Sequence, residues 1–337
     1  MDLMRISGMQ TGHIQGIAID KKRGFMYHSF TTCLLKTDMD GNILGSVNGL
    51  AGHLGCIAFN PEDGRIYGSL EYKHDAIGKG ILGRIGNGTD VEDGFYIAIF
   101  DGEKIDRMDM DAEADGVMTA VYLDEVVKDY AAPNHRYGCS GIDGITFAPI
   151  PGKRGGKRFL YVAYGIYGDT KRFDNDNQVI LRYDIRKWRA YEAPLKQDAM
   201  HKQGPDAPDS KYFVFTGNTT YGIQNLEYDA DTNCLFAAVY KGKKPDYPNY
   251  PMYLVNLDED AVACCGGERL RLANRGETDA ATDLRGIDFP YGTTGMISLG
   301  KGQFLFSKDF KDDAGWGTVI SEYRFTGNGF EESEKNA

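Results

Sequence analysis

Hydrophobic residues along the chain fall in short runs that are separated by Gly, Asp, Asn and Pro. The runs are rich in β-branched and aromatic side chains, which is typical of β-strands joined by tight turns. A recurring sequence motif, called the repeat phrase below, lies at the start of some of these runs. A second apolar strand follows each copy of the motif. Clear copies are 12–19 (GHIQGIAI) and 52–59 (GHLGCIAF), and weaker copies are 141–147, 222–228 and 283–289. A unit that recurs along a chain indicates a solenoid, an array or a propeller.

Each copy of the phrase begins a unit of several predicted strands. The first unit has strands near 14–20, 25–32, 34–39 and 43–47. Four antiparallel strands repeated around a ring form a β-propeller. We therefore predict an all-β protein with a single propeller domain over residues 1–337, with five blades and with six as the alternative. The expected blades are 12–50, 51–130, 138–218, 220–273 and 283–330.

Three further segments complete this picture. A strand at 3–8 is expected to close the last blade, and a strand at 269–272 to complete the fourth. The segment 123–130 places Leu123, Val126, Val127 and Tyr130 on one face and predicts a short helix. The insertions 73–94, 124–137 and 186–211 account for the length beyond a minimal propeller, and any sixth blade would lie in one of them.

Two polar segments resemble ligand-binding loops only in part. The glycines of 78–80 and 83–88 lack the strand–loop–helix context of a phosphate-binding loop, so a mobile loop over the channel is expected there. The segment 172–178 (RFDNDNQ) is rich in oxygen ligands but lacks the Gly and the final Glu of an EF-hand loop. This pattern favours a turn over a calcium site.

The propeller topology predicts where polar side chains meet. Strands alternate in direction, so the start of every inner strand and the loop between second and third strands lie on one face. The inner strands bring His13, Gln15, His53, Asp143, Gln224, Asn225, Asp283 and Arg285 to this face. The loops bring Glu71, Lys73, Asp75, Tyr164, Tyr167, Tyr240, Lys308, Asp309 and Trp316. The link between the second and third blades adds His135 and Arg136.

His13 and His53 occupy equivalent positions in adjacent repeats. With Glu71 and Asp143 they form a mixed nitrogen and oxygen set that could bind a divalent metal ion or transfer protons. The alternative is that the Gly-His pair is a structural repeat whose imidazoles bind the blade backbone. No spacing in the sequence selects among metal binding, proton transfer and a structural role.

Aromatic residues end all five second strands. Such side chains either stack on a sugar or pack between blades. The first interpretation predicts a site for a polyhydroxylated ligand, in which Arg136 or Arg285 pairs an anionic group. The five aromatic residues are Phe30, Tyr72, Tyr164, Tyr240 and Phe310. The full set of candidate ligand-binding residues is Gln15, Tyr72, His135, Arg136, Tyr164, Gln224, Tyr240, Arg285, Lys308 and Asp309.

Charge and cysteine content narrow the classes of partner. A net charge of −11 opposes binding to nucleic acid or to an anionic membrane surface. No run is long and apolar enough to span a bilayer, and no motif indicates a nucleotide cofactor. The six cysteines show neither a disulfide framework nor metal-type spacing. Reduced thiols favour the cytoplasm, with the periplasm or secretion as alternatives if a leader has been removed.

In its repeats the chain resembles β-propeller proteins, and its five units resemble the five-bladed kind. That group includes glycosidases with inner-strand carboxylates, calcium-dependent nucleotidases and sugar-binding lectins. Asp143 and Asp283 are the nearest matches to the glycosidase carboxylates, whereas the first two repeats have His13 and His53 there. Lactonase-type propellers place Glu, Asn and Asp around a metal, which would correspond here to Glu71, Asn225 and Asp143.

Two functions follow as hypotheses. The first is a hydrolase or lyase that acts on a small carbohydrate-derived or other polar molecule in the axial pocket, with His13, His53, Glu71 and Asp143 as acid–base groups or metal ligands. The second is a non-catalytic propeller that binds a sugar or a partner protein on the same face. The substrate and the oligomeric state are left open by the sequence.

Overall fold

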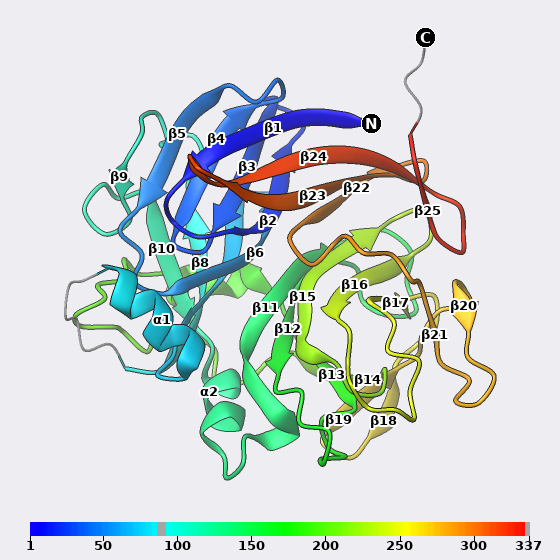
Figure 1. Ribbon diagram of the computed structural model, residues 1–337. Coiled ribbons are helices and arrows are strands. Elements are labelled where there is room, and N and C mark those ends of the chain that lie inside the picture. Colours follow the sequence, from blue (N-terminus) through cyan, green and yellow to red (C-terminus); the bar gives the residue numbers. More distant parts are fainter. Residues whose placement is uncertain (86–91, 334–337) are drawn as a thin grey trace.

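The computed structural model describes residues 1–85 and 92–333, and in it five β-sheets surround a central axis as a five-bladed β-propeller (Figure 1). Each inner strand contacts the inner strand of the next blade, and the fifth contacts the first, so the ring is closed. The predictions of an all-β fold and of five blades are confirmed. The inner strands are β2 (Ile14–Asp20), β6 (His53–Asn60), β11 (Cys139–Ala148), β15 (Thr220–Asp229) and β22 (Met296–Gly300).

The remaining strands pair outward from these inner strands. Blade one adds β3 (Phe25–Phe30), β4 (Cys33–Asp38), β5 (Ile43–Asn48) and β9 (Met110–Asp111). Blade two adds β7 (Arg65–Tyr72), β8 (Gly94–Phe100) and β10 (Met118–Tyr122). Blade three adds β12 (Phe159–Ile166), β13 (Asn177–Tyr183), β14 (Ser210–Phe215), β19 (Gly267–Leu270) and β18 (Val262–Cys264). Blade four adds β16 (Cys234–Tyr240) and β17 (Met252–Asn256).

Blade five combines the two ends of the described chain. It contains β23 (Gln303–Asp312), β24 (Gly315–Phe325) and β25 (Phe330–Glu332), and β1 (Asp2–Met9) pairs antiparallel with β24. Figure 1 shows the blue β1 beside the red β24. This pairing joins residues that are more than 300 positions apart, as between Arg5 and Val319. The N-terminal strand thus gives blade five its outer edge.

One expected outer strand lies in a different blade. The segment 269–272 was expected to complete blade four, but β19 pairs in parallel with β14 of blade three. Only the residues that follow reach blade four, where the Asn256 amide donates to Arg271 O at 2.9 Å and the Ala273 amide to Leu254 O at 2.7 Å. The segment therefore links the outer edges of two blades.

The hydrophobic core is divided into five clusters, one between each pair of neighbouring blades. Strand β8 shows why. All seven of its residues are buried, and alternate side chains point to opposite faces of the sheet. Tyr96 and Phe100 join the cluster toward blade one, whereas Phe95, Ile97 and Ile99 join the cluster toward blade three.

Two helices cover the links of blade two. The predicted helix is confirmed as α2 (Asp124–Ala131). The glycines at 78–80, expected in a mobile loop, lie in α1 (Ala76–Ile85), where the Gly78 amide donates to Asp75 Oδ1 at 2.9 Å. Glycine has a low helix propensity, so local sequence did not indicate this helix. The second glycine segment, 83–88, begins within α1, and its residues 86–88 lie outside the described residues.

The fifth copy of the repeat is at a different position from the one expected. Residues 283–289 do not form the inner strand of blade five. They contain β21 (Arg285–Gly286), which pairs with β20 (Glu277–Thr278), and Ile287 bridges to Met252 of blade four. The inner strand follows Gly292 and Gly295, in the segment 291–299 (YGTTGMISL), whose glycine spacing matches that of the second repeat, Gly52 and Gly55.

Four of the inner strands share a register shift near their start. The shifts lie between Ile14 and Gly16 in β2, Leu54 and Ile57 in β6, Ile142 and Ile145 in β11, and Ile223 and Asn225 in β15. A β-bulge redirects side chains and increases the local twist of a strand. The bulged residues Gln15, Gly55, Asp143 and Gln224 therefore occupy equivalent positions around the channel.

All six cysteines lie in the described part of the chain and are unpaired thiols. Four of them, Cys33, Cys56, Cys139 and Cys234, are buried, as small apolar side chains often are. In the described residues, no helix is both long enough and apolar enough to cross a bilayer.

Candidate functional site

A cavity of about 310 Å³ opens at the end of the channel where the inner strands begin. It is formed by blades one to four and by the loop that follows β7. Its lining combines charged, amide and aromatic side chains, as expected of a site for a small polar molecule. The lining side chains are His13, Gln15, His53, Glu71, Lys73, Asp75, Ser140, Ile142, Asp143, Tyr167, Tyr221, Gln224 and Tyr240.

Glu71 and Lys73 form a buried ion pair in the wall of this cavity. Lys73 Nζ lies 2.6 Å from Glu71 Oε1 and donates to the carbonyl of Ser140 at 2.9 Å. The other carboxylate oxygen, Oε2, accepts the Ile142 amide at 3.1 Å. Burial alone would raise the pKa of Glu71, but the Lys73 ammonium and the adjacent His53 outweigh it, so the pKa of Glu71 is lowered. Glu71 is therefore ionised at neutral pH.

His53 lies against the same carboxylate at the start of β6. Its Nδ1 is 3.5 Å from Glu71 Oε1, which is an ion-pair contact but too long for a strong hydrogen bond. Burial lowers the pKa of an imidazole, but here Glu71 and Asp143 outweigh that effect, so the pKa of His53 is raised. These two carboxyl groups thus favour the protonated form of the imidazole more than water does.

Asp143 is the buried acid of the site. It occupies the bulge of β11, is 8 % exposed, and accepts the Cys56 amide at 3.3 Å through Oδ1. Burial, reinforced by the negative charge of Glu71, raises the pKa of Asp143 to about 7, although His53 and Lys73 oppose the shift. Two carboxyl groups on one cavity thus have pKa values displaced in opposite directions.

Gly55 makes room for this acid. An added Cβ at Gly55 would lie 2.2 Å from Asp143 Oδ1 and 2.6 Å from Ser69 Oγ. The position equivalent to Gln15 and Gln224 therefore has no side chain in blade two, and the carboxyl group of blade three occupies the space.

Amide and aromatic side chains line the other side of the cavity. Gln15 Nε2 lies 3.1 Å from His13 Nε2 and donates to Thr31 Oγ1 at 3.3 Å. The His13 ring lies 5.5 Å from that of Trp316. At the rim, the half-exposed rings of Tyr221 and Tyr240 meet edge to face at 6.0 Å. Such rings offer a surface on which a sugar can stack.

Seven of the fourteen candidate residues line this cavity, namely His13, Gln15, His53, Glu71, Asp143, Gln224 and Tyr240. Tyr72 and Tyr164 do not. Tyr72 is buried between blades and donates to Gln197 Oε1 at 3.0 Å, and Tyr164 is buried and donates to Asp129 Oδ2 at 2.9 Å. For these two strand ends, packing between blades is the correct interpretation, because the alternation of the strand turns their rings into the core.

His135 and Arg136 are held by α2 and the loop after it. His135 Nδ1 contacts the carbonyl of Tyr130 at 2.6 Å, and its ring lies 5.1 Å from that of Tyr167, which does line the cavity. Arg136 pairs with the buried Asp129 at 2.9 Å. Neither reaches the cavity, because each is bound to the helix that anchors this link.

The remaining three candidates lie elsewhere as well. Arg285 is in β21 and donates to Asn274 Oδ1, so its assignment to an inner strand is wrong. Lys308 lies 4.9 Å from the ring of Tyr291 and 3.8 Å from Asp2 Oδ1. Asp309 is exposed on β23 and does not line the cavity, although its charge acts on Tyr240.

The most important residue without an assigned role was Lys73. It was expected on this face, but its pairing with Glu71 could not be derived from the sequence. Both side chains point into the same wall because Glu71 and Lys73 are two residues apart at the end of one strand, where side chains alternate. Ser140 and Tyr221 were missed because they precede the recognisable repeat phrase.

The described residues around this cavity give no support to a metal centre. In residues 1–85 and 92–333, no group of three or more His, Cys, Asp or Glu side chains is arranged to hold a metal ion. The Lys73 ammonium supplies the positive charge beside Glu71, where a divalent ion would have to bind. The divalent-metal site on His13, His53, Glu71 and Asp143 stays a prediction, and no step below depends on it.

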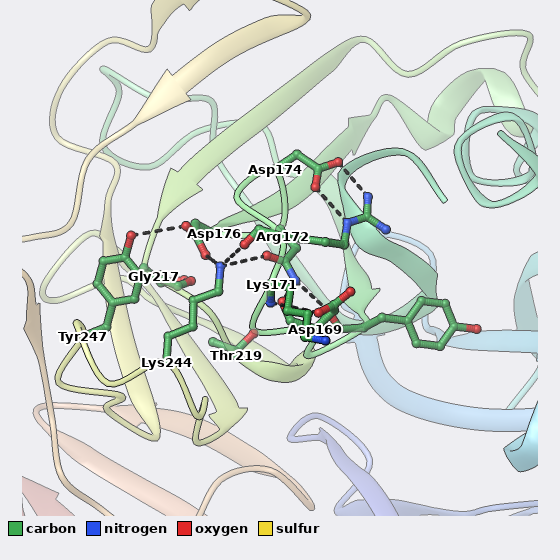
Figure 2. Close-up of polar contacts among 12 residues, drawn as sticks. Asp169, Lys171, Arg172, Asp174, Asp176, Gly217, Thr219, Lys244 and Tyr247 are labelled. Atoms are coloured by element: carbon green, nitrogen blue, oxygen red, sulfur yellow. Dashed lines mark hydrogen bonds and ion pairs between the residues drawn. The ribbon is translucent and has the colours of Figure 1, made fainter. Parts of the chain in front are cut away.

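The oxygen-rich segment 172–178 binds the side-chain ammonium group of Lys244. Figure 2 shows the Lys244 ammonium directed at the Asp176 carboxylate, which Tyr247 binds from the other side. Lys244 Nζ lies 2.5 Å from Asp176 Oδ1 and 3.2 Å from Asn175 Oδ1, and it also donates to the Arg172 carbonyl. The lysine occupies the position that a metal ion would take in such a loop.

No protein-family model matches the chain, and no curated protein sequence matches it. Solved structures are similar at low identity. A GH43 β-1,3-galactosidase with galactodeoxynojirimycin is 12 % identical, with 98 % of this chain and 99 % of that chain covered and a TM-score of 0.44. A gluconolactonase of Xanthomonas campestris is 11 % identical, with 95 % and 79 % covered and a TM-score of 0.40. Hydrazine synthase of Kuenenia stuttgartiensis is 11 % identical, with 93 % and 72 % covered and a TM-score of 0.41. At these TM-scores the similarities carry no argument about function.

Proposed function

We propose that the protein is a hydrolase that acts on a small carbohydrate-derived molecule in the 310 Å³ cavity. The observation that carries the proposal is the pair of carboxyl groups with opposite pKa shifts, Asp143 raised to about 7 and Glu71 lowered. Environments that separate the pKa values of neighbouring acids let one site hold both a protonated carboxyl group, which can donate a proton, and a charged carboxylate, which can stabilise a positive charge.

The proposed roles follow from these charges. Protonated Asp143 gives its proton to the leaving oxygen as the bond from carbon to that oxygen breaks. Neutral His53 takes a proton from the water that attacks the same carbon, and the ionised Glu71 beside Nδ1 stabilises the imidazolium that forms. Lys73 is a positioning residue, because its ammonium group is bound to Glu71 and to the carbonyl of Ser140. Gln15, Gln224 and Tyr240 would bind hydroxyl groups of the ligand.

The test is turnover of a panel of aryl glycosides and sugar lactones by the wild type and by Asp143→Asn and His53→Gln. Each substitution should lower kcat by about 10²-fold or more, because each removes a proton-transfer group. A matched control is Asp309→Asn, whose carboxylate lies outside the cavity lining. If both variants turn over a substrate of the wild type at the full wild-type rate, the proposed roles are wrong.

A non-catalytic sugar-binding propeller is the second candidate, and the exposed pair of Tyr221 and Tyr240 favours it. Under this function, monosaccharides raise the melting temperature because they bind only the folded state. Tyr240→Ala should abolish that rise, whereas Asp143→Asn should leave it in place. Binding without turnover would therefore select this function.

A further inference from the structure

A second and larger cavity, of about 670 Å³, lies at the other end of the channel. Its walls are the ends of the inner strands and the turns that follow β2 and β6, whereas the 310 Å³ cavity is built from the starts of those strands. We call it the distal cavity. None of its lining residues is among those proposed to act in hydrolysis.

Two carboxyl groups from inner strands line the distal cavity, namely Asp20 of β2, which already pairs with Arg23 at 2.9 Å, and Glu227. Glu227 of β15 is partly buried, and its Oε1 accepts the Ser298 amide at 2.9 Å, while its Oε2 lies 3.5 Å from Thr146 Oγ1. Burial, with a smaller contribution from the charge of Asp229, raises the pKa of Glu227 to about 7. The Ser298 amide and the positive charges of Arg158 and Lys21 oppose this shift. A cationic group that bound there would restore the charged carboxylate.

The same cavity contains a guanidinium group without a counterion. Arg158 is exposed and lies 5.3 Å from the ring of Tyr228. Across the described ranges 1–85 and 92–333, it forms neither an ion pair nor a hydrogen bond. Its charge acts on Glu227, yet the two groups do not touch. A guanidinium in this situation binds a carboxylate readily and can do so with two parallel hydrogen bonds.

Apolar side chains line the same cavity. Phe59 and Leu299 are partly exposed in its wall, and Ile17, Ile57 and Ile297, which also line it, are buried. A ligand that satisfies all three features has a positive group, a negative group and a short apolar part. We infer that the distal cavity binds a small zwitterion of the α-amino-acid type, with its ammonium group on Glu227 and its carboxylate on Arg158.

The experiment measures binding of L-leucine to the full chain by calorimetry and by thermal shift. Two analogues separate the contributions of the charges, namely leucinamide, which lacks the carboxylate, and 4-methylpentanoate, which lacks the ammonium group. Leucine should bind saturably and raise the melting temperature. Each analogue should bind at least about tenfold more weakly, because it leaves one charged group unpaired.

Variants test the two anchors. Glu227→Gln keeps the acceptor for Ser298, and Arg158→Gln removes an exposed guanidinium, so both should fold, and each should weaken leucine binding by about tenfold or more. Lys22→Gln, an exposed residue of the same rim, is the matched control and should bind as the wild type does. Three results would overturn the inference: equal binding of leucine and both analogues, leucine binding that survives in both Glu227→Gln and Arg158→Gln, or no saturable binding of leucine.

Discussion

Lys73 Nζ lies 2.6 Å from Glu71 Oε1, and the two side chains are only 6 % and 5 % exposed. The pair closes the wall of the candidate site between blades two and three, since Lys73 also binds the carbonyl of Ser140 and Glu71 binds the amide of Ile142. A buried charge is tolerated only when its counter-charge and hydrogen bonds are present. The pair therefore couples the charge state of the site to the packing of two blades.

Replacing Lys73 should expose this coupling. Lys73→Met leaves the Glu71 carboxylate buried beside the imidazole alone, and breaking a buried pair in this way costs about 3–5 kcal/mol. The variant should unfold at a lower urea concentration than the wild type. Lys79→Met, on an exposed position of α1, serves as the control and should change stability by less than about 0.5 kcal/mol. Equal stability of the two variants would contradict the buried pair.

The raised pKa of Asp143 predicts how stability depends on pH. Because that pKa is about 7, well above the value near 4 in an unfolded chain, the folded protein binds this proton more tightly. The stabilisation is full below about pH 4 and is lost as the pH rises through about 7, and the displacement is worth on the order of 4 kcal/mol.

Asp143→Asn removes this titration. The free energy of unfolding should therefore fall less between pH 5 and pH 8 in the variant than in the wild type, as measured by urea denaturation at each pH. Asp309→Asn, on an exposed carboxylate, should retain the wild-type dependence. Parallel pH profiles for the wild type and Asp143→Asn would show that Asp143 is ionised throughout this range.

Gly55 tests whether the site needs the space that it leaves for Asp143. In Gly55→Ala the new methyl group would lie 2.2 Å from Asp143 Oδ1, so the carboxyl group has to move. We expect catalysis or sugar binding to fall by about tenfold or more, since small displacements of a catalytic group are costly. Gly80→Ala has no atom within 4 Å of the new Cβ and should leave the site unchanged.

Lys244 is expected to be a stability residue rather than a site residue. Lys244→Met would leave Asp176 without its counterion in a buried position, which should cost about 3–5 kcal/mol. Lys241→Met removes an ion pair with Asp288 in which both side chains are more than half exposed, and it should cost less than about 1 kcal/mol. Thermal denaturation of both variants measures the difference. A Lys244→Met protein as stable as Lys241→Met would show that the loop does not need its cation.

The repeat phrase predicted the blade number and the channel face, because a blade's inner strand is specified by local alternation and glycine spacing. His13, Gln15, His53, Asp143 and Gln224 line the cavity as expected, since each is at a fixed offset within its phrase. The fifth phrase was misplaced, as 283–289 resembles the pattern by composition while 291–299 carries the actual strand.

The sequence by itself determined which segments are strands, how many blades they form and which strand ends face the channel, because these depend on patterns within a few residues. Only the tertiary structure decided which side chains meet. Tyr72 and Tyr164 turn into the core, Lys73 neutralises Glu71, and Asp143 enters the space beside Gly55. The contact of Asp143 with Gly55 joins two blades that are far apart in sequence, and the pKa values of the site follow from burial and charge that only the folded arrangement creates.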